Sequence, residues 1–204
     1  MSLENLPLTE IGLVVAAVIC YVLIRRIGKD KRDESRSAKL MEKYATLTAA
    51  NLASTPDDER VEAVVANVLS RAADNRRPDP EKELAVMPQP FTIVYSVWAV
   101  CKELTHGSYA TLTRTATRSM VNPAIDGLPV IGATATAVAL AALRDAHADK
   151  QHTAEAEKAF HAAVEQECPL TLCVAYIRDH VPQLLGEDVD EDDAVAAEDT
   201  ADEA

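Results

Sequence analysis

The feature that most constrains this chain is an unbroken run of fourteen residues without a charge, Ile11 to Ile24 (IGLVVAAVICYVLI). Extended to residues 8–27, the stretch reaches twenty residues, the length of helix that crosses roughly 30 Å of hydrocarbon at about 1.5 Å per residue. Glu10 lies near one end of it. The sequence therefore predicts a single transmembrane helix at residues 8–27 with the lipid bilayer as its partner. A buried helix is the alternative, because the uncharged run alone is short.

The flanks of this run set its predicted orientation. The preceding ten residues, MSLENLPLTE, hold two acids and no base, which disfavours a cleavable signal peptide. The bases follow the run, at Arg25, Arg26, Lys29, Lys31 and Arg32. Because basic flanks stay on the inner side of a membrane, we expect a single-pass protein of the cell membrane with its N-terminus outside and its C-terminal domain cytoplasmic. Cys101, Cys168 and Cys173 would then be free thiols in a reducing compartment.

Charge divides the 204-residue chain into regions. Its formal net charge is −13, and residues 187–204 hold ten acids and no base. We predict an anchor at 1–28, a charged juxtamembrane helix or linker at 29–54, a helical domain at 55–185 and a disordered acidic tail at 186–204. The tail either solubilises the protein or attracts a basic partner. Its candidate interaction residues are Glu187, Asp188, Asp190, Glu191, Asp192 and Asp193.

Apolar residues between the two ends recur at helical spacing. Val61, Val64, Val65, Val68 and Leu69 form one such stripe after a helix start at Thr55-Pro56. No segment alternates with the period of two that a strand shows. We therefore predict an all-α fold, a compact multi-helix bundle. The remaining predicted helices cover 91–106, 108–120, 134–148, 153–167 and 169–180, with a loop at 75–90 and turns at 122–123 and 127–129.

Motifs for chemistry are absent from the sequence. It contains no glycine-rich phosphate loop, no GxSxG and no HExxH. Cys168 and Cys173 lack the second ligand pair that a zinc site needs, so core-facing cysteines are expected. We accordingly predict no enzyme, no catalytic residue, no metal, no cofactor and no direct nucleic-acid contact. Glu103 lies near a predicted helix C-terminus, where the helix dipole disfavours it, so an ion pair with Arg114 or Arg118 is expected.

Three sequence blocks stand out in the helical region: VYSVW followed by ELTHGSY (residues 94–109), VIGA (130–133) and YIRDH (176–180). Together they resemble a bacterial all-helical domain family typified by a DNA-mimic protein. The resemblance covers about residues 57–185, with His106, Ser108 and Thr111 departing from the family pattern. It implies a helical fold, a dimer and an acidic surface that occupies a DNA-binding protein. The residues that carry the motif are Trp98, Glu103, Gly107, Tyr109 and Gly132.

These observations favour an interaction protein over a catalyst. The leading hypothesis is a membrane-anchored cytoplasmic module that binds a basic or DNA-binding protein through its acidic surface or tail. The alternative is a structural or scaffolding protein that self-associates through its helices, as a homodimer for example. An enzyme with an unrecognised site is the weakest of the three, because no set of residues meets the geometric roles that catalysis needs.

Overall fold

The computed structural model describes residues 36–73 and 79–186, and in this part of the chain all regular elements are helices. The prediction of an all-α fold is therefore confirmed. Residues 36–43 are helical, and the elements that follow are α2 (Ala49–Ser54), α3 (Asp57–Ala73), α4 (Pro80–Leu84), α5 (Gln89–His106), α6 (Tyr109–Leu112), the 3-10 helix η2 (Ala116–Met120), α7 (Val121–Val130), α8 (Thr134–Ala148), α9 (Ala154–Glu167), α10 (Pro169–Asp179) and α11 (Val181–Leu184).

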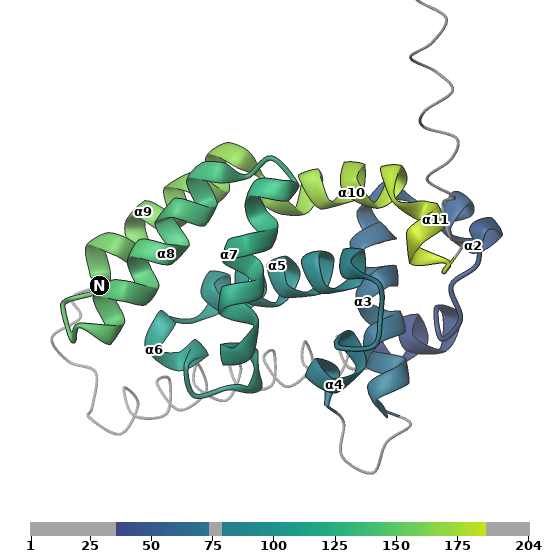
Figure 1. Cartoon of the computed structure of the whole chain (residues 1–204), viewed down its shortest axis with the longest axis horizontal. Coiled ribbons are helices and arrows are strands. Elements are labelled where there is room, and N and C mark those ends of the chain that lie inside the picture. Colours follow the sequence, from purple (N-terminus) through teal and green to yellow (C-terminus); the bar gives the residue numbers. More distant parts are fainter. Residues whose placement is uncertain (1–35, 74–78, 187–204) are drawn as a thin grey trace, which may run out of the picture.

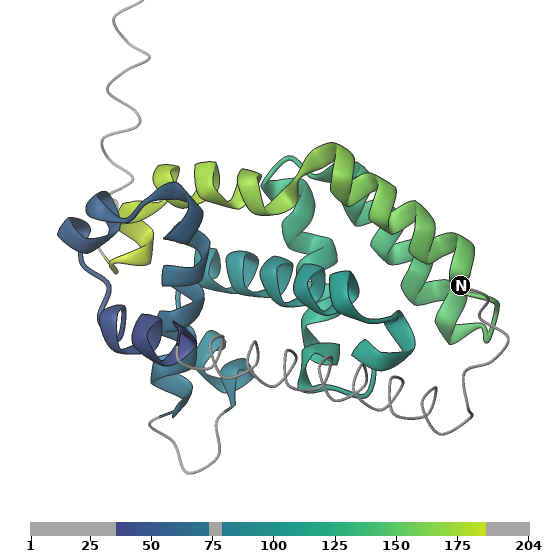
Figure 2. The same cartoon turned by 180° about the vertical axis from the view of Figure 1, so that it is seen from behind.

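Helix α5 is the centre of the arrangement. Helix α7 crosses it on one side, so α7 lies in front of α5 in Figure 1 and behind it in Figure 2. Helices α8 and α9 form an antiparallel pair at one end of the molecule, and α3 packs against α5 at the other end. Helix α10 runs back from α9 to contact both α3 and α5. Helices close in sequence thus pack side by side, and α10 ties the two ends together.

The core follows the predicted apolar stripes. On α3, Val61, Val64, Val65 and Val68 are buried, and Leu69 packs against the same core. Helix α5, the longest helix in the described part of the chain, buries eleven of its eighteen residues. Burial of such surface stabilises the fold by about 25 cal/mol per Å², so α5 supplies much of the folding energy.

Two predicted helix boundaries differ from the structure. The segment 108–120 forms two short helices, because the hydroxyls of Thr113 and Thr115 donate to the carbonyls of residues 110 and 112 and compete with a continuous helix. Conversely, the turns predicted at 122–123 and 127–129 lie inside α7. Pro123 falls in its first turn, where no intrahelical amide bond is lost.

Residues 36–55 pack against α3. The side chain of Tyr44 is completely buried, and the amide of Asn67 on α3 donates to the carbonyls of Tyr44 and Ala45 at 3.0 and 2.9 Å. The hydroxyl of Thr55, which precedes α3, donates to the Asn51 carbonyl at 2.6 Å and lies within hydrogen-bond distance, 3.0 Å, of the Tyr44 hydroxyl. The part of the predicted linker that the structure describes is thus attached to the folded body.

The predicted single-pass membrane localisation needs a correction. Across residues 36–73 and 79–186, no helix combines the length and the apolarity needed to cross a bilayer. The apolar side chains of the long helices face one another in the core instead of forming a continuous apolar surface. The topology with an outer N-terminus and a cytoplasmic domain is therefore contradicted. The segment on which it was based, residues 8–27, lies outside the described residues.

Candidate functional site: a groove beside Trp98

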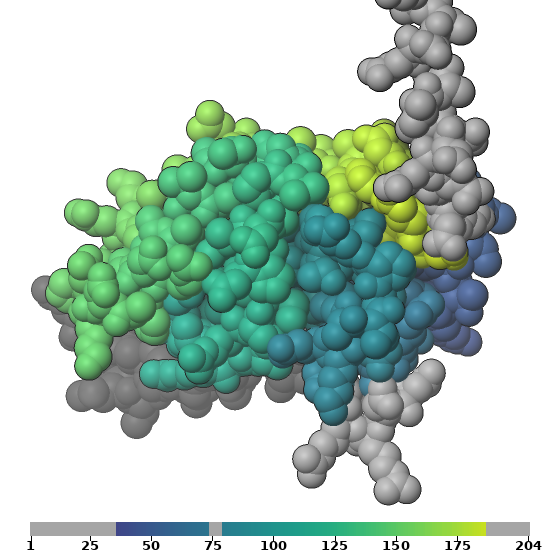
Figure 3. Space-filling model, viewed as in Figure 1, coloured from purple at the N-terminus to yellow at the C-terminus, as the bar shows by residue number. Residues whose placement is uncertain are grey.

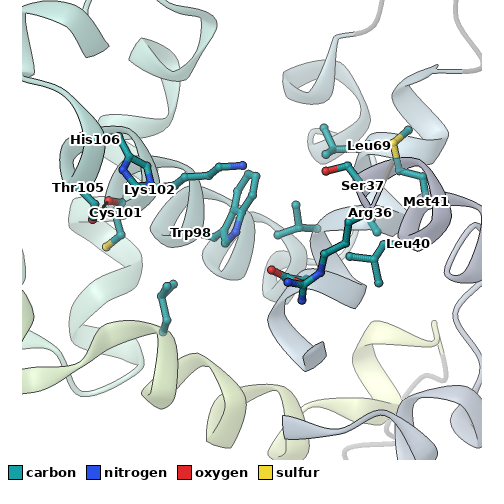
Figure 4. A pocket seen from close by; sticks show the side chains of 14 residues that line it. Arg36, Ser37, Leu40, Met41, Leu69, Trp98, Cys101, Lys102, Thr105 and His106 are labelled. Carbon is teal, nitrogen blue, oxygen red and sulfur yellow. Dashed lines mark hydrogen bonds and ion pairs between the residues drawn. The ribbon is translucent and has the colours of Figure 1, made fainter. Parts of the chain in front are cut away.

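A hollow of about 440 Å³ lies beside Trp98, and we call it the Trp98 groove. In Figure 4 the side chains of α5 form one wall and those of residues 36–41, with Leu69 of α3, form the other. Leu170 of α10 completes the lining. The lining residues are Arg36, Ser37, Leu40, Met41, Glu62, Val65, Ala66, Leu69, Trp98, Cys101, Lys102, Thr105, His106 and Leu170.

The residues of the α5 wall lie on one face of the helix because of their spacing. Trp98, Cys101, Lys102 and Thr105 stand at i, i+3, i+4 and i+7, so they share one face of the helix. The other faces of α5 are turned into the core. The helical spacing of Trp98 with Phe91 and Cys101 predicts that Trp98 lies at the centre of the core, yet it is only partly buried and borders the groove. The chain therefore presents its only tryptophan at a surface hollow.

Charged groups stand over the apolar surfaces of the groove. The ammonium of Lys102 lies 4.6 Å from the centroid of the Trp98 ring, a cation–π contact. On the opposite wall, the Arg36 guanidinium donates to the Glu62 carboxylate at 2.7 Å. Both members of that pair are substantially exposed, so the pair contributes little to stability and leaves its charges available to a partner.

A second hollow of about 480 Å³ adjoins the first. Glu62, Trp98 and Leu170 line both hollows, so they form the boundary between them. Asp57 and Asp58, in the first turn of α3, also line the second hollow. The Arg178 guanidinium of α10 donates to Asp57 at 2.5 Å, whereas no hydrogen bond or ion pair within the described residues involves the Asp58 carboxylate. We call the two hollows together the channel; its lining combines apolar side chains with acids and bases.

Two buried thiols lie near the base of the groove. Burial raises the pKa of Cys101 from 9.0 to about 12. Burial, together with the neighbouring Cys101, raises the pKa of Cys173 to about 12 as well. Both thiols therefore stay protonated at neutral pH and are poor nucleophiles. Cys168 was expected to face the core but is exposed, because it occupies a left-handed turn (φ 48°) between α9 and α10.

Some residues of the motif that resembles the DNA-mimic family stabilise the fold. Tyr109 is buried, and its backbone N–H donates to the Glu157 carboxylate of α9 at 2.9 Å. Gly132 has φ +89°, a conformation that favours glycine. Gly107 has φ −143°, which any residue adopts. The expected ion pair of Glu103 with Arg114 or Arg118 is not among the contacts of the described residues.

Sequence reasoning missed one polar group that organises the fold. The Glu167 carboxylate accepts the backbone N–H of Ala135 at 2.9 Å and both the N–H and the hydroxyl of Thr136 at 2.7 Å. Burial opposes ionisation of this carboxyl, but the hydrogen bonds from Thr136 and Ala135 outweigh it and lower its pKa. Glu167 thus caps α8 from thirty-one residues away, and no local pattern in the sequence signals this.

Several predicted sites stay untested. The tail residues 187–204 lie outside the described residues. Within residues 36–73 and 79–186, no group of three histidine, cysteine or acidic side chains could hold a metal ion.

Comparison with known proteins adds no relative. No protein-family model, no curated protein and no solved structure matches this chain. The resemblance to the DNA-mimic family therefore stays a prediction, and the site has to be interpreted from its own geometry.

Proposed function

We propose that this protein is an interaction module that binds an amphipathic helix with a basic flank in the Trp98 groove. The observation that carries the proposal is the open face of α5, where Trp98 borders two adjoining hollows. Helix-in-groove recognition places the apolar face of a partner helix into a hollow of this kind, with anchors at i, i+3, i+4 and i+7. Tryptophan is also the residue type most enriched at interaction hot spots.

The dimensions of the groove suit a helix. Its α5 wall extends from Trp98 to Thr105, which corresponds to about 10 Å of helix at 1.5 Å per residue. The opposite wall offers Leu40, Met41 and Leu69. Apolar side chains on both walls can therefore enclose the apolar stripe of a bound helix while its polar face stays in water.

Charge favours a basic flank on the partner. Asp58 lines the channel without an ion pair among the described residues, and the C-terminal eighteen residues of the chain contain ten acids. Acidic groups increase the rate at which a basic segment associates, and salt screens this effect. The distribution of charge along the chain thus supports a basic protein partner over an acidic one.

A defined peptide tests the proposal. An eighteen-residue helix of leucine and lysine, with the leucines on one face, is titrated against the full chain while the emission of Trp98 is recorded. We expect a saturable emission change that weakens with salt, and a weaker response for a peptide with glutamate in place of lysine. Asp58→Lys should reduce both affinity and salt dependence, whereas Asp149→Lys, an exposed control, should not. Absence of any response to either peptide, both in the unmodified chain and in Val14→Asp/Val18→Asp, which places two charges in the apolar run of residues 11–24, contradicts the proposal.

A further inference from the structure

We propose that the chain's own apolar segment, residues 11–24, occupies the Trp98 groove and that a partner helix must displace it. This inference rests on the proposed function, because it names the resident occupant of the same groove. It is carried by the place where the described chain begins, by the length of the chain before that point and by the chemistry of both surfaces.

The described chain begins at the groove itself. Arg36 and Ser37 are its first residues, and both line the hollow. Figure 4 shows Arg36 on the wall opposite Lys102, with Trp98 between them. Any segment that precedes residue 36 is thus tethered at the mouth of the groove. A short tether gives an effective concentration in the millimolar range, which no free partner easily matches.

The tether is long enough. Eleven residues, 25–35, separate the apolar run from Arg36. They span about 17 Å as a helix, at 1.5 Å per residue, and up to roughly 36 Å when extended. The α5 wall is only about 10 Å long by the same helical rise. Residues 11–24 can therefore reach every part of the groove from the mouth.

The apolar run matches the groove chemically. Residues 11–24 carry no charge, so a helix over this run would be apolar on every face, and Ile11, Val14, Val15, Val18 and Val22, at i, i+3, i+4, i+7 and i+11, would form one apolar stripe among these faces. Left in water, such a stripe would forfeit about 25 cal/mol per Å² of apolar area. The half-buried Trp98 and the exposed Leu170 offer surfaces on which that area can be buried.

The charge pattern continues through the tether. Two bases just after the tether already pair with acids of α3, Arg36 with Glu62 and Lys43 with Glu59. Residues 25–35 hold five more bases and three acids, a net charge of +2; the bases are Arg25, Arg26, Lys29, Lys31 and Arg32, and the acids are Asp30, Asp33 and Glu34. Asp58, which has no ion pair among the described residues, lines the same channel. The N-terminal segment thus offers an apolar helix face and a net basic flank, the two features that the proposed function requires of a ligand.

Photo-crosslinking of the full chain identifies the occupant. p-Benzoylphenylalanine is incorporated in place of Lys102 in the groove and, as a control, in place of Val138, which is 67% exposed on α8. After irradiation, mass spectrometry maps the linked peptides. We expect the probe at position 102 to link to residues 8–32 and the probe at 138 not to. Val14→Asp/Val18→Asp should abolish that link, whereas Val14→Leu/Val18→Leu should retain it.

Mixing chains with different nitrogen isotopes separates the possible occupants. Links within one isotope species support the inference, and links between species show that a second copy fills the groove and overturn it. Loss of the link on addition of phosphatidylcholine vesicles, with flotation of the protein, also overturns it in favour of a lipid surface. If no link forms but the leucine–lysine peptide still binds, the inference fails and the proposed function stands. If the link forms but the peptide never binds, even to Val14→Asp/Val18→Asp, the proposed function fails and the groove is a cradle for the N-terminal segment.

Discussion

Helix α5 has two faces with different surroundings. On one face α7 approaches so closely that a Cβ added at Gly127 would lie 3.2 Å from Cγ2 of Ile93. Figure 3, seen from this side, shows the segment from α6 to α8 covering the middle of the molecule. On the other face Trp98 and Lys102 border a hollow of about 440 Å³.

This difference suggests that the two faces of α5 have different roles, one in stabilising the fold and the other in binding. The closed face fills space with small and branched side chains, which is how an interior reaches crystal-like packing. The open face keeps a large aromatic ring only partly buried, beside a cation. A ring that the fold does not bury completely contributes less to folding, and it is available for a ligand.

The largest expected effect contrasts two aromatic residues of α5. Phe91 is 2% exposed, so Phe91→Ala should destabilise the protein by about 3–5 kcal/mol, as for a core aromatic residue. Trp98→Ala should cost less than half of that, because its ring is only partly buried, yet it should abolish the response to the leucine–lysine peptide when binding is followed by calorimetry. Urea unfolding measures the stabilities. Equal losses of stability for both variants would show that the groove face is part of the core.

A second contrast concerns two glycines. Gly127→Ala puts a methyl group 3.2 Å from Cγ2 of the buried Ile93. We expect overpacking, at about 1–3 kcal/mol, to exceed the gain of up to about 1 kcal/mol in helix propensity. Gly132→Ala meets no atom within 4 Å, so only its left-handed backbone is strained, at about 1–2 kcal/mol. A crystal structure of Gly127→Ala should show α7 displaced from α5. If α7 stays in place without loss of stability, the close contact does not define the closed face.

The pH dependence of stability tests whether the thiols of Cys101 and Cys173 are buried from solvent. In the unfolded chain Cys101 and Cys173 have their ordinary pKa of 9.0, and in the folded protein it is about 12. The unfolded chain therefore releases protons that the folded protein keeps, so this stabilisation is complete below pH 9 and is lost as the pH rises toward 12. Each group contributes a slope of at most about 1.36 kcal/mol per pH unit.

Urea unfolding between pH 7 and 10.5 tests this. Burial also raises the pKa of Tyr95, Tyr109 and Tyr176, so their slopes have the same sign. Cys101→Ala/Cys173→Ala should flatten the dependence, and Cys168→Ala should leave it unchanged, because that thiol is exposed. An unchanged slope in the double variant would mean that solvent already reaches both buried thiols from the groove.

The smallest expected effect lies far from the groove. Glu167→Ala removes the cap of α8 and should cost about 1 kcal/mol, whereas Glu165→Ala, an exposed neighbour, should change stability by less than about 0.5 kcal/mol. Because the pKa of Glu167 is lowered in the fold, its contribution is present above the unfolded pKa and is lost as the pH falls. Peptide binding should be equal in both variants; a change in binding would couple the two ends of the molecule.

The sequence predicts those parts of this molecule that depend on local periodicity. The bounds of α8 were predicted correctly at both ends, and α9 and α10 within one residue, because Thr153 and Pro169 mark helix starts. Helix α7 was not predicted, because Pro123 and Gly127 are typical of turns. The burial of Val121, Ala124 and Leu128 in the core nevertheless favours a helix there. Tertiary packing, which no local pattern records, decides such cases.

The candidate site was not predictable from local patterns. The helical spacing of Trp98 from Phe91 and Cys101 predicts a core position. That spacing does not show whether another helix covers the face of α5 on which Trp98 lies. The groove is formed by residues 36–41, α3, α5 and α10 together, and their contact depends on the return of α10 along the molecule. The caps at Glu157 and Glu167 bridge distant helices for the same reason.

Quenching of Trp98 fluorescence by acrylamide in the full chain tests the central claim most directly, because the protein has a single tryptophan. If residues 11–24 cover the open face of α5, Trp98 is weakly quenched in the unmodified chain and in Val14→Leu/Val18→Leu. In Val14→Asp/Val18→Asp the quenching constant should rise toward that of free N-acetyltryptophanamide, while the far-ultraviolet circular dichroism stays helical. An identical quenching constant in all three proteins would contradict the account.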